Sequence, residues 1–311
     1  MRLSNPDLKA LQVFRSVVEN HGFRGAQLAL NVSPSVVSTY MKALEQRLGF
    51  QVCQRGKGGF RLTDKGRAVY ESLKKLDGAL DAFELSIGEL RDTLSGRLRV
   101  GLSANTVTDD QLRIYEVIRS FGERGYDVFF DIVVLPTELL ERGLVNGEYQ
   151  IAIAPFVNQL DILRYEKLYN ERHRMYCSWR HSFFDREDAS IPLTEVADQR
   201  FVTRAYMHQN DLAHLTGARA AASVSSMEAQ LIMILSGYYI GYLADHYAAP
   251  WVSRGLLREL SHKELEFSLQ FYLATQRNQP NSLVFRTFTD DLIRQLQPNG
   301  RGVSALTPHE I

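Results

Sequence analysis

The sequence predicts an α+β protein of several domains: a helical N-terminal part, a long helix, and a two-lobed α/β part. Three observations carry this prediction. Two short helical segments meet at a sharp turn between residues 22 and 49. An apolar repeat typical of a long helix follows, and beyond residue 96 short apolar strands alternate with helical stretches. The domain boundaries that we expect are 1–63, 64–95, 96–297 and a tail at 298–311.

The N-terminal part begins with three predicted helices. Ser4 and Pro6 suit the start of a supporting helix, as an N-cap and a first-turn proline. The helix after the turn is expected to begin at Ser33 and Pro34, and its buried face is Val37, Met41, Leu44 and Leu48. Its other face carries short polar groups and one cation that suit a DNA major groove, namely Ser35, Ser38, Thr39 and Lys42. A small helical subdomain with a hydrated polar face is the alternative.

Residues 50–63, FQVCQRGKGGFRLT, predict a β-hairpin around a Gly-Lys-Gly-Gly turn. This hairpin carries Arg55, Lys57 and Arg61, so a wing beside the helix would contact backbone phosphates. Residues 1–75 hold thirteen Lys and Arg against five Asp and Glu, a net charge of +8 in a chain that is neutral overall. Such asymmetry indicates that one end of the chain meets a polyanion.

This stretch resembles the DNA-binding end of LysR-type transcriptional regulators. The residues that carry the resemblance are Leu11, Phe14, Val17, Gly22, Phe23, Ala26, Leu28, Ala29, Leu30, Val32, Ser33, Ser35, Val37, Ser38, Leu44, Glu45, Leu48, Gly49, Arg55, Leu62, Thr63 and Gly66. It implies a winged helix-turn-helix that binds DNA through Arg24, Ser33, Pro34, Ser35, Ser38, Thr39, Lys42, Arg55, Lys57 and Arg61. The family often has glutamine at Pro34, arginine at Thr39, and alanine or threonine at Gly25. The usual base contacts are therefore not assumed, and Ser38 and Lys42 remain candidates.

The next segment predicts how copies of the chain assemble. Apolar residues recur at steps of 4, 3, 4, 3, 4, 3 and 4 at Val69, Leu73, Leu76, Leu80, Phe83, Ile87, Leu90 and Leu94. This heptad seam predicts a helix roughly 45 Å long, paired with another helix. A long helix folded onto its own domain is the alternative. The resemblance implies a dimerising linker helix, with Val69, Leu73, Leu76, Leu80, Phe83, Ile87 and Leu90 in the interface.

Beyond residue 96 the alternation predicts a mainly parallel sheet with helices on both faces. A strand is expected at 98–102 and a helix at 109–124, and further elements at 127–135, 138–146, 150–154, 173–179, 200–203, 226–235, 240–243, 267–275 and 283–296. The first lobe would comprise about 96–167 and 268–297, and the second about 168–267.

Two α/β lobes joined by crossing strands resemble the periplasmic-binding-protein fold, which the LysR family uses to sense a small molecule. Helix N-termini facing a cleft would offer N–H groups and a positive dipole end. The expected effector-binding residues are Ser103, Asn105, Thr106, Pro155, Phe156, Thr203, Arg204, Ser225 and Ser226. Arg204 could hold a carboxylate bidentately, although a solvated loop is its alternative. For Ser103 and Asn105 the alternative is helix capping without a ligand.

Other chemistry is sparse in the sequence. Two cysteines, Cys53 and Cys177, suit a reducing compartment, whereas a peroxide switch would need a pair in the sensing part. His208, Asp211 and His214 match no strong zinc spacing. Phosphate loops, nucleophile elbows and HExxH are missing from the sequence, so we expect no enzyme, no catalytic residue, no metal and no cofactor besides an unknown small effector.

The sequence shows no signal peptide and no apolar run of membrane-spanning length, so we expect a cytoplasmic protein with no membrane partner. The expected partners are double-stranded DNA at a promoter or operator, a second copy in a homodimer or homotetramer, a small organic effector, and RNA polymerase. The alternative is a solute-binding or enzymatic two-lobed protein with an N-terminal helical tether. It would need an export signal or a reactive constellation, and neither is visible in the sequence.

Overall fold

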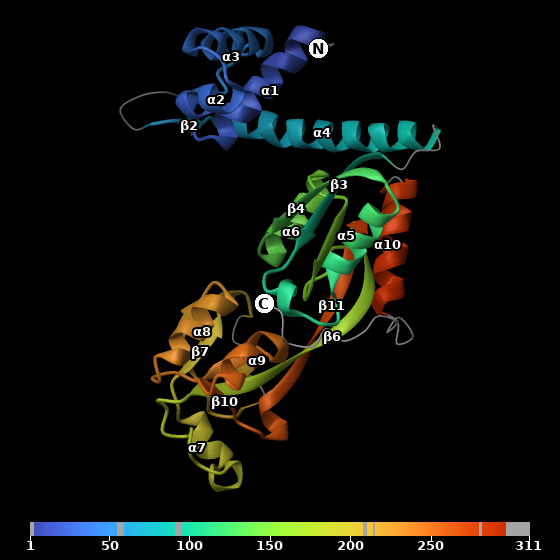
Figure 1. Ribbon diagram of the computed structural model, residues 1–311. Helices are drawn as coiled ribbons and strands as arrows, with labels where there is room; N and C mark the ends of the chain where they lie inside the picture. The colour runs from blue at the N-terminus through green and yellow to red at the C-terminus, as the bar shows by residue number, and fades with distance from the viewer. Residues whose placement is uncertain are drawn as a thin grey trace. The chain divides into compact units, whose positions relative to one another are not determined.

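The computed structural model describes residues 3–54, 59–90, 95–207, 210–213, 215–279 and 282–296 (Figure 1). The chain divides into two compact units, Met1–Phe83 with Asn146–Glu148, and Glu84–Val145 with Tyr149–Ile311. Each unit is built around cores of its own.

The N-terminal unit contains three helices followed by a short hairpin and the start of a long helix. Its elements are α1 (Asn5–Glu19), α2 (Phe23–Leu30), α3 (Pro34–Leu48), β1 (Cys53–Gln54), β2 (Arg61–Leu62) and α4 (Asp64–Leu90). α2 ends at Asn31 and α3 ends at Gly49, both in the left-handed conformation that stops a helix. Strands β1 and β2 pair antiparallel, as a wing requires.

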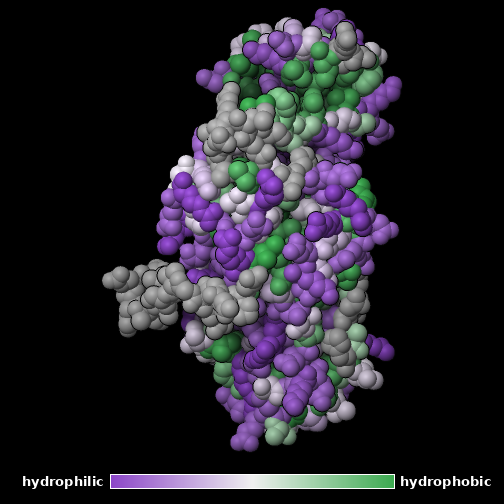
Figure 2. Space-filling view, turned by 90° about the vertical axis from the view of Figure 1, so that its right-hand side faces the viewer, coloured by the Kyte–Doolittle hydropathy of each residue, from purple (hydrophilic) through white to green (hydrophobic). Residues whose placement is uncertain are grey.

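The heptad seam of α4 is used in two ways. Its first apolar residues, Val69, Leu73 and Leu76, pack into the core of the N-terminal unit. Further along the helix, Leu80 is 47% exposed and Phe83 is 63% exposed. Apolar side chains also gather on the surface of this unit in Figure 2. The later part of the described seam is therefore the more exposed part in a single chain.

The second unit contains two lobes. We define the first lobe by β3 (Ser95–Leu102), α5 (Ile114–Glu123), β4 (Asp127–Val134), α6 (Thr137–Asn146), β5 (Ile151–Ala154) and α10 (Leu283–Leu296). The second lobe comprises α7 (Leu193–Ala197), β7 (Phe201–Arg204), β8 (Ala220–Val224), α8 (Met227–Leu235), β9 (Gly241–Ala244), α9 (Asp245–Ser253) and β10 (Leu257–Glu259). Two long strands, β6 (Leu163–Ser178) and β11 (Glu266–Gln276), run through both lobes (Figure 1).

The expectation of a mainly parallel sheet is wrong. The large sheet has the order β10-β6-β11-β5-β3-β4, with β9 also paired to β6. Strand β3 pairs parallel with β4 and β5, but the other pairings in this sheet are antiparallel. The physical reason is that β6 and β11 cross between the lobes in opposite directions. The crossing also explains why β6 begins at Leu163, although a strand is predicted only from His173.

Two further differences affect the site. The helix expected from Asp109 begins only at Ile114, because the short 3₁₀ helix η1 (Thr106–Thr108) and a loop precede it. Helix α9 is not among the predicted elements, and Pro250 lies inside it. Both segments bring polar side chains to the boundary between the lobes. No described helix has the length and apolar character that crossing a membrane demands.

Candidate functional site

The first candidate site is the outer face of α3. Val37, Met41 and Leu44 are buried and Leu48 is half-buried, as the spacing predicts. On the opposite face Ser35, Thr39 and Lys42 are exposed and Ser38 is half-buried; Arg24, Ser33, Pro34 and Arg61 are also exposed. Burial of one stripe therefore leaves the predicted DNA-reading residues at the surface.

Hydrogen bonds within α3 limit what two of these groups can do. The Thr39 hydroxyl donates to the carbonyl of Ser35 over 2.8 Å, so its oxygen remains as an acceptor. The hydroxyls of Ser33 and Ser35 lie 2.9 Å apart. Ser33 precedes α3, but its side chain makes no capping hydrogen bond. The Arg55 and Lys57 predictions lie outside the described residues, so Arg61 is the described cation of the predicted wing.

The second candidate site is a cavity of about 180 Å³ between the two lobes of the second unit. Six predicted effector-binding residues line it: Ser103, Asn105, Pro155, Arg204, Ser225 and Ser226. They come from the ends of β3, β5 and β7 and from the start of α8. Ligands bind at such strand ends because neighbouring loops and helix N-termini converge there.

Three predicted residues do not line this cavity. Thr106 is buried, with its hydroxyl 3.5 Å from the carbonyl of Ser103. Phe156 is buried and packs edge-on against Tyr165, with ring centroids 5.3 Å apart. Thr203 is buried one residue before Arg204. Because successive side chains of a strand point to opposite faces, Arg204 faces the cavity and Thr203 does not.

The cavity has polar features suited to a small ligand. Ser226 caps α8 by accepting from the N–H of Ala229 over 3.2 Å. The Ser103 hydroxyl is buried and has no hydrogen-bond partner among the described residues. Asn105 adopts φ +69, an uncommon conformation for a residue with a side chain. Ser226 thus makes a capping hydrogen bond, whereas the Ser103 and Asn105 side chains make none to the residues that the structure describes.

Sequence reasoning missed several residues of the cavity. They are Ala104, Val134, Leu135, Pro136, Thr137, Glu171, Met227, Leu269 and Phe271. Glu171 lies within a strand where charged residues are frequent, so it resembles a surface residue in the sequence. The available signal was the two-residue spacing of Glu171 and His173, which places both on one face of a strand.

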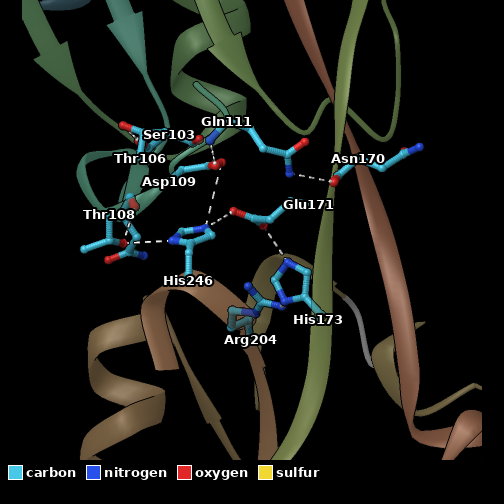
Figure 3. Close-up of polar contacts among 11 residues, drawn as sticks. Ser103, Thr106, Thr108, Asp109, Gln111, Asn170, Glu171, His173, Arg204 and His246 are labelled. Carbon is cyan, nitrogen blue, oxygen red and sulfur yellow. Dashed lines mark hydrogen bonds and ion pairs between the residues drawn. The ribbon is translucent and has the colours of Figure 1, made fainter. Parts of the chain in front are cut away.

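Glu171 is the centre of a buried chain of polar contacts beside the cavity (Figure 3). Its Oε2 lies 2.5 Å from Nε2 of His173, and its Oε1 lies 2.9 Å from Nε2 of His246. The Arg204 guanidinium donates to Nδ1 of His173 over 3.2 Å. On the other side, Nδ1 of His246 lies 2.8 Å from the hydroxyl oxygen of Thr108. The chain thus joins both lobes through the crossing strand β6.

Burial and hydrogen bonds set the charges of Glu171 and of the histidines that contact it. Burial alone would raise the pKa of Glu171, but hydrogen bonds from His173 and His246 outweigh it and hold this pKa at about 2. Burial lowers the pKa of His173 to about 4, and the Arg204 charge adds to this effect. Burial also acts to lower the pKa of His246, but contacts with Glu171 raise it overall. At neutral pH Glu171 is therefore ionised and His173 is neutral.

In the described part of the chain, the carboxylate and imidazole atoms of Asp109, Glu171 and His246 lie within 4.8 Å of one another, close enough for a cation. A hydrogen bond accounts for the proximity of Glu171 and His246, and Asp109 faces the same His246 nitrogen over 3.9 Å while accepting the N–H of Gln111. We therefore assign the cluster to hydrogen bonding, and the expectation of no metal stays a prediction.

Comparisons with known proteins cover both sites. The family model described as "Bacterial regulatory helix-turn-helix protein, lysR family" matches residues 8–67, and "LysR substrate binding domain" matches residues 91–297. The chain is 33% identical over 290 residues to the "HTH-type transcriptional activator BauR" of Pseudomonas aeruginosa, which covers 93% of this chain and 95% of that protein.

Two solved structures show the same fold. Full-length CbnR in complex with its target DNA aligns over 93% of this chain and 99% of its own, with a TM-score of 0.66 and 15% identity. LysG of Corynebacterium glutamicum with bound effector Arg aligns over 94% of this chain and 98% of its own, with a TM-score of 0.50 and 19% identity. At this identity the likeness concerns the fold alone.

Proposed function

Since this chain belongs to the LysR family of bacterial transcriptional regulators, we propose that a small carboxylate bound between its lobes controls how it engages operator DNA. We infer that the ligand is a carboxylate because Arg204 is buried in the wall of the interlobe cavity. A guanidinium matches a carboxylate with two parallel hydrogen bonds. Ser103 and the N-terminus of α8 offer further donors beside it.

In this proposal the nine predicted effector residues have unequal roles. Ser103, Asn105, Arg204, Ser225 and Ser226 would contact the ligand, and Pro155 would close one wall. Thr106, Phe156 and Thr203 would support the cavity from behind, because they are buried outside it. Thr137 joins the contact set, since it lines the same cavity, and Glu171 would hold the chain of polar contacts behind it.

The DNA contacts follow from exposure and charge. Ser35, Ser38, Thr39 and Lys42 of α3 would read the major groove, while Arg24, Arg61 and the Arg55 and Lys57 of the wing would contact phosphates. Ser33 and Pro34 would set the start of the reading helix. The match of residues 8–67 to the lysR-family helix-turn-helix model supports this assignment.

Assembly and location complete the proposal. Val69, Leu73 and Leu76 would fix α4 on its own domain, and Leu80, Phe83, Ile87 and Leu90 would face a second copy in a homodimer or a tetramer built from dimers. The protein would act by binding in the cytoplasm, with RNA polymerase as a further partner, and would catalyse no reaction. We keep 1–63, 64–95, 96–297 and 298–311 as its proposed divisions.

A thermal-shift series tests the ligand class. Small carboxylic acids are compared with the primary amides of the same carbon skeletons, because the pair differs in charge and hardly in shape. We expect some acids to raise the melting temperature, as a ligand at 100 times its Kd stabilises by ~2.7 kcal/mol, and their amides to fail. Arg204→Gln should abolish the shift.

Arg200→Gln is the matched control for this series, because Arg200 is exposed and precedes β7. It should retain the full shift. Amides that stabilise as strongly as their acids, or an unchanged shift in Arg204→Gln, would contradict the carboxylate proposal. Footprinting on the DNA upstream of the chain's own gene tests the operator contact separately.

A further inference from the structure

A histidine of the second lobe contacts the first lobe with one ring nitrogen and the crossing strand β6 with the other. His246 is the second residue of α9 in the second lobe. Its Nδ1 lies 2.8 Å from Thr108 of the first lobe, and its Nε2 lies 2.9 Å from Glu171 of the crossing strand (Figure 3). This ring therefore bridges the boundary that a ligand must open or close.

The hydrogen-bond partners of this ring favour its doubly protonated form. An ionised carboxylate can only accept, so Nε2 of His246 must carry a proton toward Glu171. The Thr108 hydroxyl donates its own hydrogen to the carbonyl of Asn105 over 3.1 Å. With its hydrogen on Asn105, the Thr108 oxygen accepts from Nδ1 of His246, which then carries a proton as well. If that hydrogen turned to Nδ1, the ring would keep one proton only. A ring with two N–H groups is an imidazolium.

The surrounding charges favour this cation. Glu171 faces it from β6, and Asp109 and Asp110 approach from the loop after η1. The Asp109 carboxylate lies 3.9 Å from Nε2 and accepts the N–H of Gln111 over 2.9 Å. Asp245 precedes it on its own helix. Two further titratable groups of β6 lie near this cluster and are neutral: His173, and Tyr169, whose pKa is raised by burial and by the Asp109 charge.

We infer that His246 is a proton-operated latch, which as an imidazolium holds the lobes in the arrangement that places Asn105, Glu171 and Arg204 around one cavity. Loss of one ring proton from His246 removes one of its two hydrogen bonds, to Glu171 or to Thr108. A bare Nε2 faces the Glu171 carboxylate with a lone pair. A bare Nδ1 faces the Thr108 oxygen, unless that hydroxyl turns away from Asn105. In either case one lobe loses a contact that positions a cavity residue.

The latch predicts that the lobes separate as pH rises. A group whose pKa is raised in the folded arrangement supports that arrangement below its ordinary pKa and loses it as pH rises through the raised value. The arrangement shown here is therefore the form with His246 protonated, and raising the pH favours the open form. The direction depends only on the latch and not on the ligand or on the operator.

Energy transfer between dyes tests this inference. Cysteines are introduced at Glu123 in the first lobe and Tyr238 in the second, where the side chains are 64% and 73% exposed. The native Cys53 and Cys177 are buried, so labelling favours the new sites. Labelled full-length chains are diluted into unlabelled protein, so that transfer reports distances within one chain. Transfer is recorded from about pH 6 to about pH 10, and we expect it to fall in a single step centred above 6.5, the ordinary histidine pKa that the folded arrangement raises.

Three variants show whether the step belongs to the latch. His246→Gln should abolish the pH step, because its amide does not titrate. Thr108→Val leaves His246 in place but removes its acceptor in the first lobe, so the step should move down by about one to two pH units. His262→Gln removes another half-buried histidine of the second lobe, and it should keep the wild-type step.

The outcomes are distinct. A wild-type transfer signal that is constant over this pH range overturns the latch. A His246→Gln variant with the wild-type step also overturns it, because another group must then titrate. If His246→Gln fails to fold by circular dichroism, Thr108→Val decides: an unmoved step contradicts the inference, and a lowered step supports it.

Discussion

The carboxylate of Glu45, in the last turns of α3, accepts a hydrogen bond of 2.9 Å from the backbone N–H of Val52, directly before β1. The N–H of Cys53 lies 3.5 Å from the same oxygen. This one side chain therefore links α3 to the start of the hairpin formed by β1 and β2. Glu45 is half-buried, so water replaces this bond poorly.

Replacing Glu45 with alanine should therefore loosen the wing. We expect the free energy of unfolding to fall by about 1.5–3 kcal/mol, the range for a hydrogen bond to a charged group. Urea denaturation of the full chain measures this change. Glu45→Gln keeps a neutral acceptor and should lose less, and equal losses in both variants would show that the hydrogen bond is not responsible.

Lys42 should contribute to DNA affinity through a phosphate or a base edge. Lys42→Ala should weaken binding and, if the contact is to a phosphate, reduce the slope of log K against log salt by about 1. Fluorescence anisotropy at several salt concentrations measures both. Lys75→Ala removes an exposed cation from α4 and should leave the slope nearly unchanged. An equal effect of the two variants would indicate a general charge effect only.

Leu80 should belong to the contact between copies of the chain. At 47% exposure it has apolar surface that a partner helix would cover. Leu80→Glu should break the dimer, which light scattering detects as a halved mass. Leu80→Met keeps the apolar volume and should stay dimeric. Because Leu73 packs inside its own unit, Leu73→Glu should instead unfold that unit.

His173 should make the protein less stable in acid. Burial lowers its pKa from 6.5 to about 4. Between these values the unfolded chain binds a proton at this residue and the folded chain does not. Stability is then lost as pH falls from about 6.5 to about 4, with a limiting slope of ~1.4 kcal/mol per pH unit. Glu171 continues the loss from 4.5 toward about 2.

His173→Gln provides the test of this slope. Glutamine can accept from Arg204 and donate to Glu171 without titrating, so the slope above pH 4.5 should become shallower by one proton. Denaturation at a series of pH values measures it. His262→Gln serves again as the control, and an identical slope in wild type and His173→Gln would refute the assignment.

Local sequence patterns were sufficient for the N-terminal unit. Apolar spacing in α3 separated Val37, Met41 and Leu44 from the exposed polar face, because a helix repeats every 3.6 residues whatever surrounds it. The ends of predicted strands and the start of a predicted helix likewise located six residues of the cavity. In these cases the residues that define a feature are neighbours in the chain.

The remaining features depend on residues that are far apart in the chain. Glu171, His246 and Thr108 meet because β6 crosses between lobes and α9 returns to it, and neither path leaves a local pattern. The same crossing made the large sheet mixed instead of mainly parallel. The sequence by itself determined the fold class, the family and the faces of individual helices. Only the tertiary structure decided which buried charges share a cavity, since burial and pairing arise from segments that pack together after the chain has folded.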